Sequence, residues 1–383
     1  RGLGDVYKRQ ILMRIALLSF HTAANYGAAL QSYALQRALT EHGFDNLYLD
    51  YQNMSRKHEY DMMFHIVDSL NHKKWLSALA YTLGTPFMEL RKYRFDKFYK
   101  ANLKKTHKMY KSSDEAKEAN SLFDKFIVGS DQVWNCVCNG YDTAFLLDFV
   151  DDNEKKISYS SSFGMSEIPD EYLDCYKKYL SEIKHISTRE IFGVKLIKQL
   201  TGRDAKLVMD PVFLLTKESW LKMTEPIKEP FVFSYTNKDN QFEAFINQIG
   251  YDMKGMKHYK LARATGIGDF ISSKVKVKYS MSPTDFLSVI NSAELVFTAS
   301  FHCTAMSIIF NRPFVVTLIG DSGKDERLLT LLKRFGLENR ILSDGMTVHD
   351  AKSPIDWNIV NSRIEELRKE SLGYLIAVSY THL

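Results

Sequence analysis

The sequence has few of the residues that would indicate a metal centre, a disulfide framework or a membrane span. Its 383 residues include four cysteines, and none of these forms a Cys-x-x-Cys pair. This spacing predicts neither a zinc site nor paired disulfides. No run reaches the roughly 18 apolar residues that a membrane-spanning helix needs, and Ile11–Phe20 is too short for a signal peptide with its flanks. We therefore expect a reduced, cytoplasmic protein.

A strong excess of one charge is also absent. The formal net charge is +5, and 45% of the residues are hydrophobic and 13% aromatic. A nucleic-acid-binding protein would be expected to concentrate basic residues on one face, so we expect no nucleic-acid partner. The apolar content is sufficient for a sizeable core, and the length predicts two domains.

Both ends of the chain differ in character from the rest. Arg1–Gln10 and Ala377–Leu383 resemble translated sequencing adapter. We therefore expect residues 1–12 and 377–383 to be non-native, with the native chain beginning at Met13, and we exclude both segments from the fold prediction.

Short apolar runs rich in β-branched residues alternate with segments of helical periodicity. A strand is predicted over Arg14–Phe20, a helix over Ala28–His42, and largely helical structure from Tyr60 to Lys111. The alternation restarts at Phe231–Tyr235, which predicts two Rossmann-like domains with parallel sheets. The expected divisions are an N-terminal domain over 13–212, a linker over 213–229, a C-terminal domain over 230–355 and a C-terminal helix over 356–376, helical from Asp356 to Ser371.

Polar residues gather where the predicted strands end. Asn25, Asp131, Arg189 and His302 each follow a different apolar run. In open parallel sheets, ligands bind outside the carboxyl ends of the strands, and the free amides of the following helix attract anions. Any one of these turns is better explained by helix capping or turn formation. Together they predict one binding cleft between two sheets.

Several segments, in a fixed order, carry a family resemblance. They read NYGAALQSYALQRALTEHGF from Asn25, FIVGSDQVWN from Phe126, KISYSSSFG from Lys156, STREIFG from Ser187 and TASFHCTAMSIIFNRPF from Thr298. From Met13 to about Glu370 the chain resembles the polysaccharide pyruvyl transferases. The resemblance implies a two-domain fold like that of the GT-B glycosyltransferases, with an interdomain cleft. It also implies phosphoenolpyruvate as donor, a sugar of a bacterial cell-surface polysaccharide precursor as acceptor, and a pyruvate ketal as product. We expect no cofactor besides phosphoenolpyruvate as co-substrate and no metal-binding residues, and the sequence does not predict whether the reaction requires a metal.

Two residues are candidates for catalysis. Ketal formation requires a proton on the vinyl carbon of the donor, and an imidazole with a pKa of about 6.5 can supply one near neutrality. We expect His302 to be that acid or to hold the donor phosphate; the alternative is a helix-cap histidine. Asp131 is expected to orient an acceptor hydroxyl or to act as base, and the alternative is a turn cap.

The donor needs fixed cations and amide donors for its carboxylate and phosphate. Arg189 can bind either group through two parallel hydrogen bonds, although it could instead form a surface ion pair. The helix near Thr304 can direct amides at the phosphate. Arg327, in a helix expected over Asp325–Phe335, is a weaker candidate, because a solvated surface arginine is the simpler explanation. The remaining expected donor-pocket residues are Ser300, Phe301 and Cys303.

Cys303 stands where the resemblance leads us to expect glycine. A cysteine would interfere there if the position required a positive φ or close approach of the backbone to phosphate. A reactive thiol is one interpretation of this residue, and a small buried side chain is the other.

The acceptor side is expected to involve two loops. Asn25, Tyr26 and Gly27 are predicted to shape a loop that approaches the ligand closely. Ser130 and Gln132 accompany Asp131 in the second loop. Trp134 could stack on a sugar ring or could be an ordinary core tryptophan.

A basic stretch over Arg91–Lys111 interleaves lysines and arginines with aromatic residues. It predicts either peripheral docking on an anionic membrane or a solvated helix whose aromatic residues face the core. Two further functions remain open, since fold does not determine function. One is a glycosyltransferase that uses a nucleotide sugar, and the other is a non-catalytic glycan- or anion-binding protein. The oligomeric state is not predicted.

Overall fold

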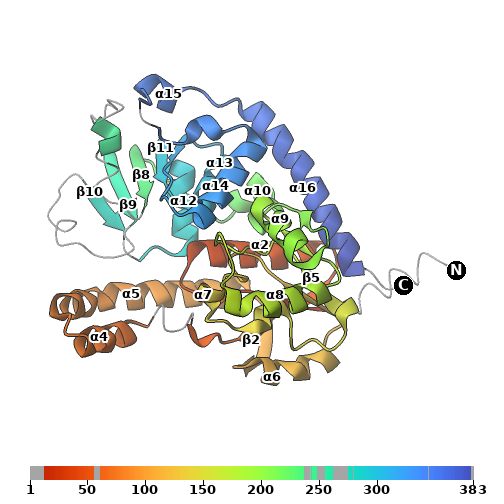
Figure 1. Cartoon of the computed structure of the whole chain (residues 1–383). Helices are drawn as coiled ribbons and strands as arrows, with labels where there is room; N and C mark the ends of the chain where they lie inside the picture. Colours follow the sequence, from red (N-terminus) through yellow and green to blue (C-terminus); the bar gives the residue numbers. More distant parts are fainter. Residues whose placement is uncertain are drawn as a thin grey trace.

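The computed structural model describes residues 13–55, 61–236, 242, 244–247, 255–261, 275–278, 280–343 and 345–380. Two five-stranded parallel sheets form its framework (Figure 1). Their strand orders are β3-β2-β1-β4-β5 and β10-β9-β8-β11-β12, so the two sheets share one topology. This order is that of a Rossmann-like half, with the order reversing beside the first strand. The adapter-like segment 1–12 lies outside the described residues.

The N-terminal half is built around a sheet whose central strands are apolar and buried. The strands are β1 (Arg14–Leu18), β2 (Asp45–Tyr51), β3 (Lys105–Tyr110), β4 (Lys125–Val128) and β5 (Lys156–Ser158), followed by the short pair β6 (Ser187–Thr188) and β7 (Lys206–Leu207). The helices are α2 (Tyr26–Glu41), α4 (Met62–Asn71), α5 (Trp75–Asn102), α6 (Ser113–Ala116), α7 (Cys136–Asn139), α8 (Asp170–Glu182) and α9 (Ile191–Thr201). All of β4 is buried, as expected of a parallel strand covered on both faces.

The C-terminal half repeats this plan. Its strands are β8 (Phe231–Tyr235), β9 (Lys257–Leu261), β10 (Val275–Lys278), β11 (Leu295–Thr298) and β12 (Phe314–Val316). Its helices are α12 (Pro283–Ser292), α13 (Phe301–Ile309), α14 (Ser322–Phe335), α15 (Val348–Lys352) and α16 (Trp357–Tyr380). The segment between the halves, predicted as a linker over 213–229, contains the short helix α10 (Lys217–Leu221), and Trp220 within it is fully buried.

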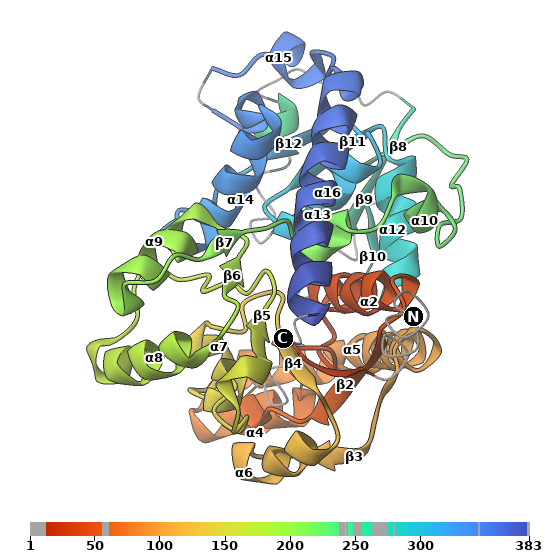
Figure 2. The same ribbon diagram turned by 90° about the vertical axis from the view of Figure 1, so that its right-hand side faces the viewer.

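The last helix joins the two halves. Near its start, Val360 and Ile364 pack in the C-terminal core, whereas Leu375 and Val378 pack against β1 and β4 of the N-terminal half. Figure 2 shows α16 running along both halves. The prediction that this helix ends at Ser371 was wrong. The helix continues to Tyr380, with Val378 and Ser379 buried, so residues 377–380 of the tail expected to be foreign are part of α16.

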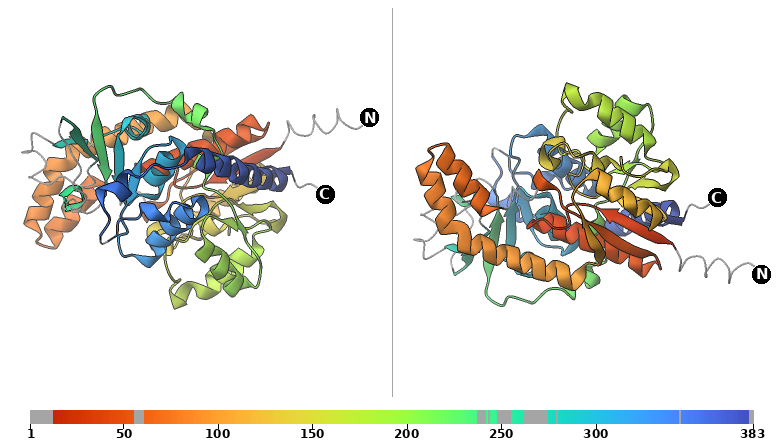
Figure 3. Two further views of the ribbon diagram at one scale, coloured as in Figure 1. Left: turned by 90° about the horizontal axis from the view of Figure 1, so that it is seen from above. Right: turned by 90° about the horizontal axis from the view of Figure 1, so that it is seen from below.

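The prediction of helix over Tyr60–Lys111 was correct for α4 and α5 and wrong for its last residues. The two helices form a hairpin that extends from the N-terminal half (Figure 3). Lys105–Tyr110 is instead the strand β3, which pairs with β2 at the edge of the sheet. Most of its side chains are solvent-accessible, so the sequence lacks the apolar alternation that predicts a strand. Among the described helices, none is long and apolar enough to cross a bilayer.

The strap formed by α16 should contribute measurably to stability. Leu375 is fully buried against the N-terminal sheet, so Leu375→Ala should lower the free energy of unfolding by about 2–5 kcal/mol. Ile359 lies on the same helix with 67% of its surface exposed, and Ile359→Ala should change it by less than about 0.5 kcal/mol. Urea denaturation of both variants measures the difference, and equal losses would show that α16 does not brace the N-terminal half.

A cationic cleft between the two sheets

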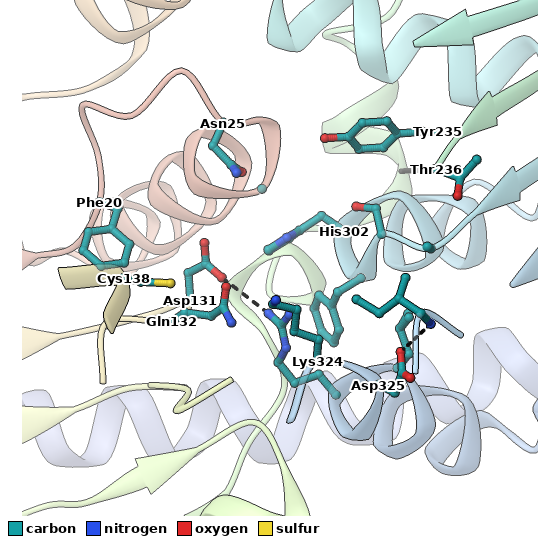
Figure 4. A pocket seen from close by; sticks show the side chains of 17 residues that line it. Phe20, Asn25, Asp131, Gln132, Cys138, Tyr235, Thr236, His302, Lys324 and Asp325 are labelled. Atoms are coloured by element: carbon teal, nitrogen blue, oxygen red, sulfur yellow. Dashed lines mark hydrogen bonds and ion pairs between the residues drawn. The ribbon is translucent and has the colours of Figure 1, made fainter. Parts of the chain in front are cut away.

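The carboxyl ends of the strands in both sheets face one cleft of about 330 Å³ (Figure 4). Its N-terminal wall follows β1 and β4 and consists of Phe20, Asn25, Gly27, Asp131, Gln132 and Cys138. Its C-terminal wall follows β8, β11 and β12 and includes Tyr235, Thr236, Ser300, Phe301, His302, Lys324, Asp325 and Arg327. In each sheet the cleft therefore lies at the point where the strand order reverses, which is the usual ligand site of such sheets.

Three helices begin at this cleft. Asn25, Ser300 and Asp321 cap the N-termini of α2, α13 and α14, and each side chain accepts a hydrogen bond from an amide of the first turn. The N-terminus of a helix carries partial positive charge and favours anions. Lys324 and Arg327, in the first two turns of α14, add positive charge to the lining, and Lys324 is paired with Asp321 at 2.8 Å. The cleft is thus electrostatically suited to a small anion.

Behind the cleft lies a buried ion cluster centred on Arg189. Its guanidinium donates to Asp131 Oδ1 at 2.9 Å and to Asp210 Oδ2 at 2.6 Å, and 1% of its side chain is exposed. It also lies over the ring of Phe301, 4.5 Å from the ring centroid. Burial alone would lower the pKa of Arg189, but the two carboxylates raise it above its usual value. The positive charge of Arg189 is therefore balanced by two carboxylates of the protein itself.

His302 is held between the two halves of the protein. Its Nε2 lies 3.4 Å from Asp210 Oδ2. On the other side of the ring, a Cβ at Gly27 would lie only 2.1 Å from His302 Nδ1, so the first turn of α2 can approach only because residue 27 is glycine. The close approach at Gly27 is therefore an approach to the imidazole of His302.

The two carboxylates of the cluster are ionised at neutral pH. Burial tends to raise the pKa of Asp210, but the charges of His302 and Arg189 outweigh it and hold that pKa well below its usual range. Burial acts in the same way on Asp131, where Arg189, His302 and Arg327 together lower the pKa. Asp131 is therefore better suited to accept a hydrogen bond than to take up a proton.

Arg327 is the cation that faces the cleft without full compensation. Within the described chain its nearest carboxylate oxygen is Asp131 Oδ1, 3.9 Å away, and its Nε makes no hydrogen bond there. Burial and then the neighbouring Arg189 lower the pKa of Arg327. An anion bound in the cleft would offset both the burial of the Arg327 charge and its repulsion by Arg189.

The structure places some of the predicted site residues in the cleft and others behind it. Those that line it are Asn25, Gly27, Asp131, Gln132, Ser300, Phe301, His302 and Arg327. Those that do not are Tyr26, Ser130, Trp134, Arg189, Cys303 and Thr304. The sequence favoured Arg189 over Arg327 as the cation that binds the donor, whereas the structure pairs Arg189 with two carboxylates and places Arg327 in the cleft wall. The positions of the strand ends do not reveal which arginine already has a carboxylate partner.

The residues behind the cleft have clear structural partners. Trp134 is fully buried and donates to the carbonyl of Phe145 at 3.1 Å, so it cannot stack on a sugar ring. The hydroxyl of Tyr26 donates to the carbonyl of Met281 at 2.9 Å, across the two halves. Thr304 donates to the carbonyl of its own cap residue. The hydroxyl of Ser130 donates to Asp210 Oδ2 at 3.2 Å.

Cys303 is a core residue of α13. It is fully buried, and burial raises the pKa of its thiol to about 12, so it is a thiol rather than a reactive thiolate. It also lies within a regular helix. The position therefore does not require a positive φ, and a cysteine causes no backbone strain there.

Two important residues were absent from the sequence-based site. Lys324 was overlooked because the helix was expected to begin at Asp325, whereas α14 begins at Ser322 and places Lys324 in its first turn. Asp210 was not among the predicted site residues, although it contacts Arg189, His302 and Ser130. In the described part of the chain, no group of three or more His, Cys, Asp or Glu residues is placed to hold a metal ion.

Comparison with known proteins agrees with this architecture. A sequence model of the family described as polysaccharide pyruvyl transferase matches residues 25–318. No curated protein matches the sequence. A putative UDP-N-acetylglucosamine 2-epimerase from Listeria monocytogenes has a similar structure, with a TM-score of 0.54, 8% identity and 95% of each chain covered. UDP-GlcNAc 2-epimerase from Neisseria meningitidis gives a TM-score of 0.52 at 7% identity, covering 96% of this chain and 99% of the other. These likenesses show a GT-B-like fold.

The buried carboxylates predict a specific response to acid. Their pKa values lie below those of the unfolded chain, so the stability they contribute is present above about pH 4 and is lost as the pH falls through the folded-state values. Asp210→Asn removes one of them and leaves Arg189 undercompensated, which should cost about 3–5 kcal/mol at neutral pH.

Urea denaturation between neutral pH and pH 2 tests this prediction. The variant should lose less stability than the parent as the pH falls below about 4, because it has one fewer depressed carboxylate to protonate. Parallel curves for the two proteins would contradict the assignment of Asp210 as an ionised partner of Arg189 and His302.

Proposed function

The chain belongs to the polysaccharide pyruvyl transferase family, and from this premise we propose that it transfers the pyruvyl group of phosphoenolpyruvate to a sugar of a cell-surface polysaccharide precursor. The product is a cyclic ketal across two sugar hydroxyls. The observation that carries this proposal is the undercompensated Arg327, which faces the cleft beside Lys324 and His302.

Phosphoenolpyruvate matches the charge and size of the cleft. It carries a phosphate and a carboxylate, and the lining offers an arginine, a lysine and three helix N-termini. Arg327 can bind a planar carboxylate or a phosphate through two parallel hydrogen bonds. The volume of about 330 Å³ is at the lower end for ligand pockets, which fits a small acid with one sugar ring at the opening.

The proposed reaction forms two carbon–oxygen bonds and releases phosphate. A proton is added to the vinyl CH2 carbon, which becomes the methyl group and leaves the neighbouring carbon electrophilic. One acceptor hydroxyl attacks that carbon and loses its proton, and the carbon–oxygen bond to phosphate breaks. The second hydroxyl then attacks the same carbon and loses its proton, which closes the ketal. Of the two hydroxyl protons released, one balances the proton taken up by the vinyl carbon and the other leaves with phosphate.

In this proposal His302 supplies the proton to the vinyl carbon. Its ring lies at the cleft wall, and Asp210 at 3.4 Å provides a carboxylate partner for the protonated imidazole. Asp131, with 13% of its side chain exposed and held ionised by Arg189, accepts a hydrogen bond from an acceptor hydroxyl. Lys324 and Arg327 hold the donor and stabilise the departing phosphate.

Replacement of His302 tests the chemical role. His302→Ala should reduce phosphate release from phosphoenolpyruvate in the presence of a sugar acceptor by roughly a hundredfold or more, because the general acid is lost. His349 is exposed and is not among the residues that line the cleft, and His349→Ala should retain the parent rate. Activity of His302→Ala within tenfold of the parent would contradict the assignment.

Ligand-dependent thermal stability tests the donor class. Phosphoenolpyruvate at about a hundred times its dissociation constant should stabilise the fold by about 2.7 kcal/mol, which raises the melting midpoint by a few degrees in a chain of this size. Arg327→Met should abolish most of that rise. Stabilisation by UDP-sugars with none from phosphoenolpyruvate would favour a glycosyltransferase and contradict the proposed donor.

A further inference from the structure

The α4–α5 hairpin carries most of the large apolar side chains that the described surface exposes. On α4 they are Met63, Phe64, Val67 and Leu70, and on α5 they are Trp75, Leu76, Leu79, Tyr81, Leu83, Leu90 and Tyr93. Scattered apolar residues on a protein surface need no explanation, but a contiguous group marks an interaction site. The hairpin projects from the N-terminal half, as Figures 1 and 3 show.

The apolar residues of α5 form one stripe along the helix. Leu76, Leu79, Leu83 and Leu90 recur at intervals of three, four and seven residues, which places them on one face. The most exposed of them are Leu76 at 85% and Leu83 at 65%. The same face continues toward Tyr93, with 63% of its surface exposed, and then becomes basic at Lys97. Along the helix the stripe therefore changes from apolar at Leu76 to basic at Lys97.

The charge of the hairpin indicates what covers this stripe. Residues 62–102 contain seven lysines and arginines against three acidic residues, a net charge of +4 in a chain whose total is +5. Lys73 and Lys74 stand at the turn, next to the exposed Trp75. Two such hairpins would repel each other, whereas an anionic surface would attract them. Leucine and tryptophan on one side with lysine at the edges is the pattern of helices that lie in a bilayer interface.

The base of the hairpin is fixed to the cleft. Arg91 donates to the carbonyl of Ala24 at 3.0 Å, and the hydroxyl of Tyr99 donates to the carbonyl of Ala23 at 2.5 Å. These carbonyls precede Asn25, which lines the cleft. The bonds also remove Arg91 from the surface, so the basic stretch expected over Arg91–Lys111 is only partly available. The exposed surface lies earlier in the chain than the sequence suggested.

We propose that the α4–α5 hairpin docks the chain on an anionic lipid bilayer, with the leucine stripe at the boundary between headgroups and acyl chains. Docking through this element holds the cleft in a fixed orientation near the membrane surface. The inference rests on the hairpin alone and does not depend on the proposed donor; combined with the proposed function, it assigns the acceptor to a membrane-borne carrier.

Vesicle co-sedimentation of the full chain tests the docking. The parent should bind phosphatidylglycerol-containing vesicles, bind pure phosphatidylcholine vesicles much less, and be released by high salt. Lys73→Glu with Lys74→Glu, and separately Leu76→Glu with Leu83→Glu, should each weaken binding by about tenfold or more. Ile359→Glu, an equally exposed apolar position on α16, should bind as the parent does.

Other outcomes would overturn the proposal. The proposal is wrong if the parent does not bind anionic vesicles, or if both hairpin variants bind them as the parent does. It is also wrong if the chain forms a dimer in solution that the leucine substitutions dissociate, because the stripe would then be covered by a second copy. Because the substituted side chains are exposed, the variants should keep the melting midpoint and phosphoenolpyruvate-dependent stabilisation of the parent. Loss of vesicle binding with that stabilisation intact separates docking from donor binding.

Discussion

The arrangement of the cleft depends on one buried guanidinium shared between two carboxylates. Arg189 joins the turn after β4, through Asp131, to the segment after β7, through Asp210. Burying such charges is costly unless each is paired, and removing one partner leaves an uncompensated charge in the interior. Asp210 then contacts His302, which the C-terminal half contributes. The cluster therefore fixes the position of an imidazole from one half of the protein relative to the sheet of the other.

The pairing of Arg189 with two carboxylates determines which cations remain for a ligand to bind. Arg189 has its charge balanced within the protein, whereas Arg327 lies 3.9 Å from the nearest carboxylate oxygen among the described residues. Lys324, in the first turn of α14, is paired with Asp321 at 2.8 Å. The cations that line the cleft thus come from the C-terminal half, and Asp131 and Gln132 lie on the opposite wall. In the proposed function, the donor and the acceptor bind to opposite walls of the cleft, and α16 packs against both halves.

The sequence was sufficient to predict the parallel sheets, since their central strands are continuous apolar runs, and to place the cleft at the strand ends. It also identified His302 and Asp131 as cleft residues. It could not predict distances between side chains from separate loops, so Arg189 was favoured over Arg327, and Trp134 was offered as a stacking residue although the core encloses it. Lys324 and β3 were missed for local reasons: a helix begins three residues early, and an edge strand is polar.

The most direct test is a crystal structure of the chain with phosphoenolpyruvate bound. The account predicts the phosphate and carboxylate between the N-termini of α13 and α14, within hydrogen-bond distance of Arg327 and Lys324, with the vinyl carbon facing His302 and with Arg189 still paired to Asp131 and Asp210. A ligand that instead displaces Asp131 from Arg189 and binds that guanidinium, or one that occupies a different surface, would contradict it.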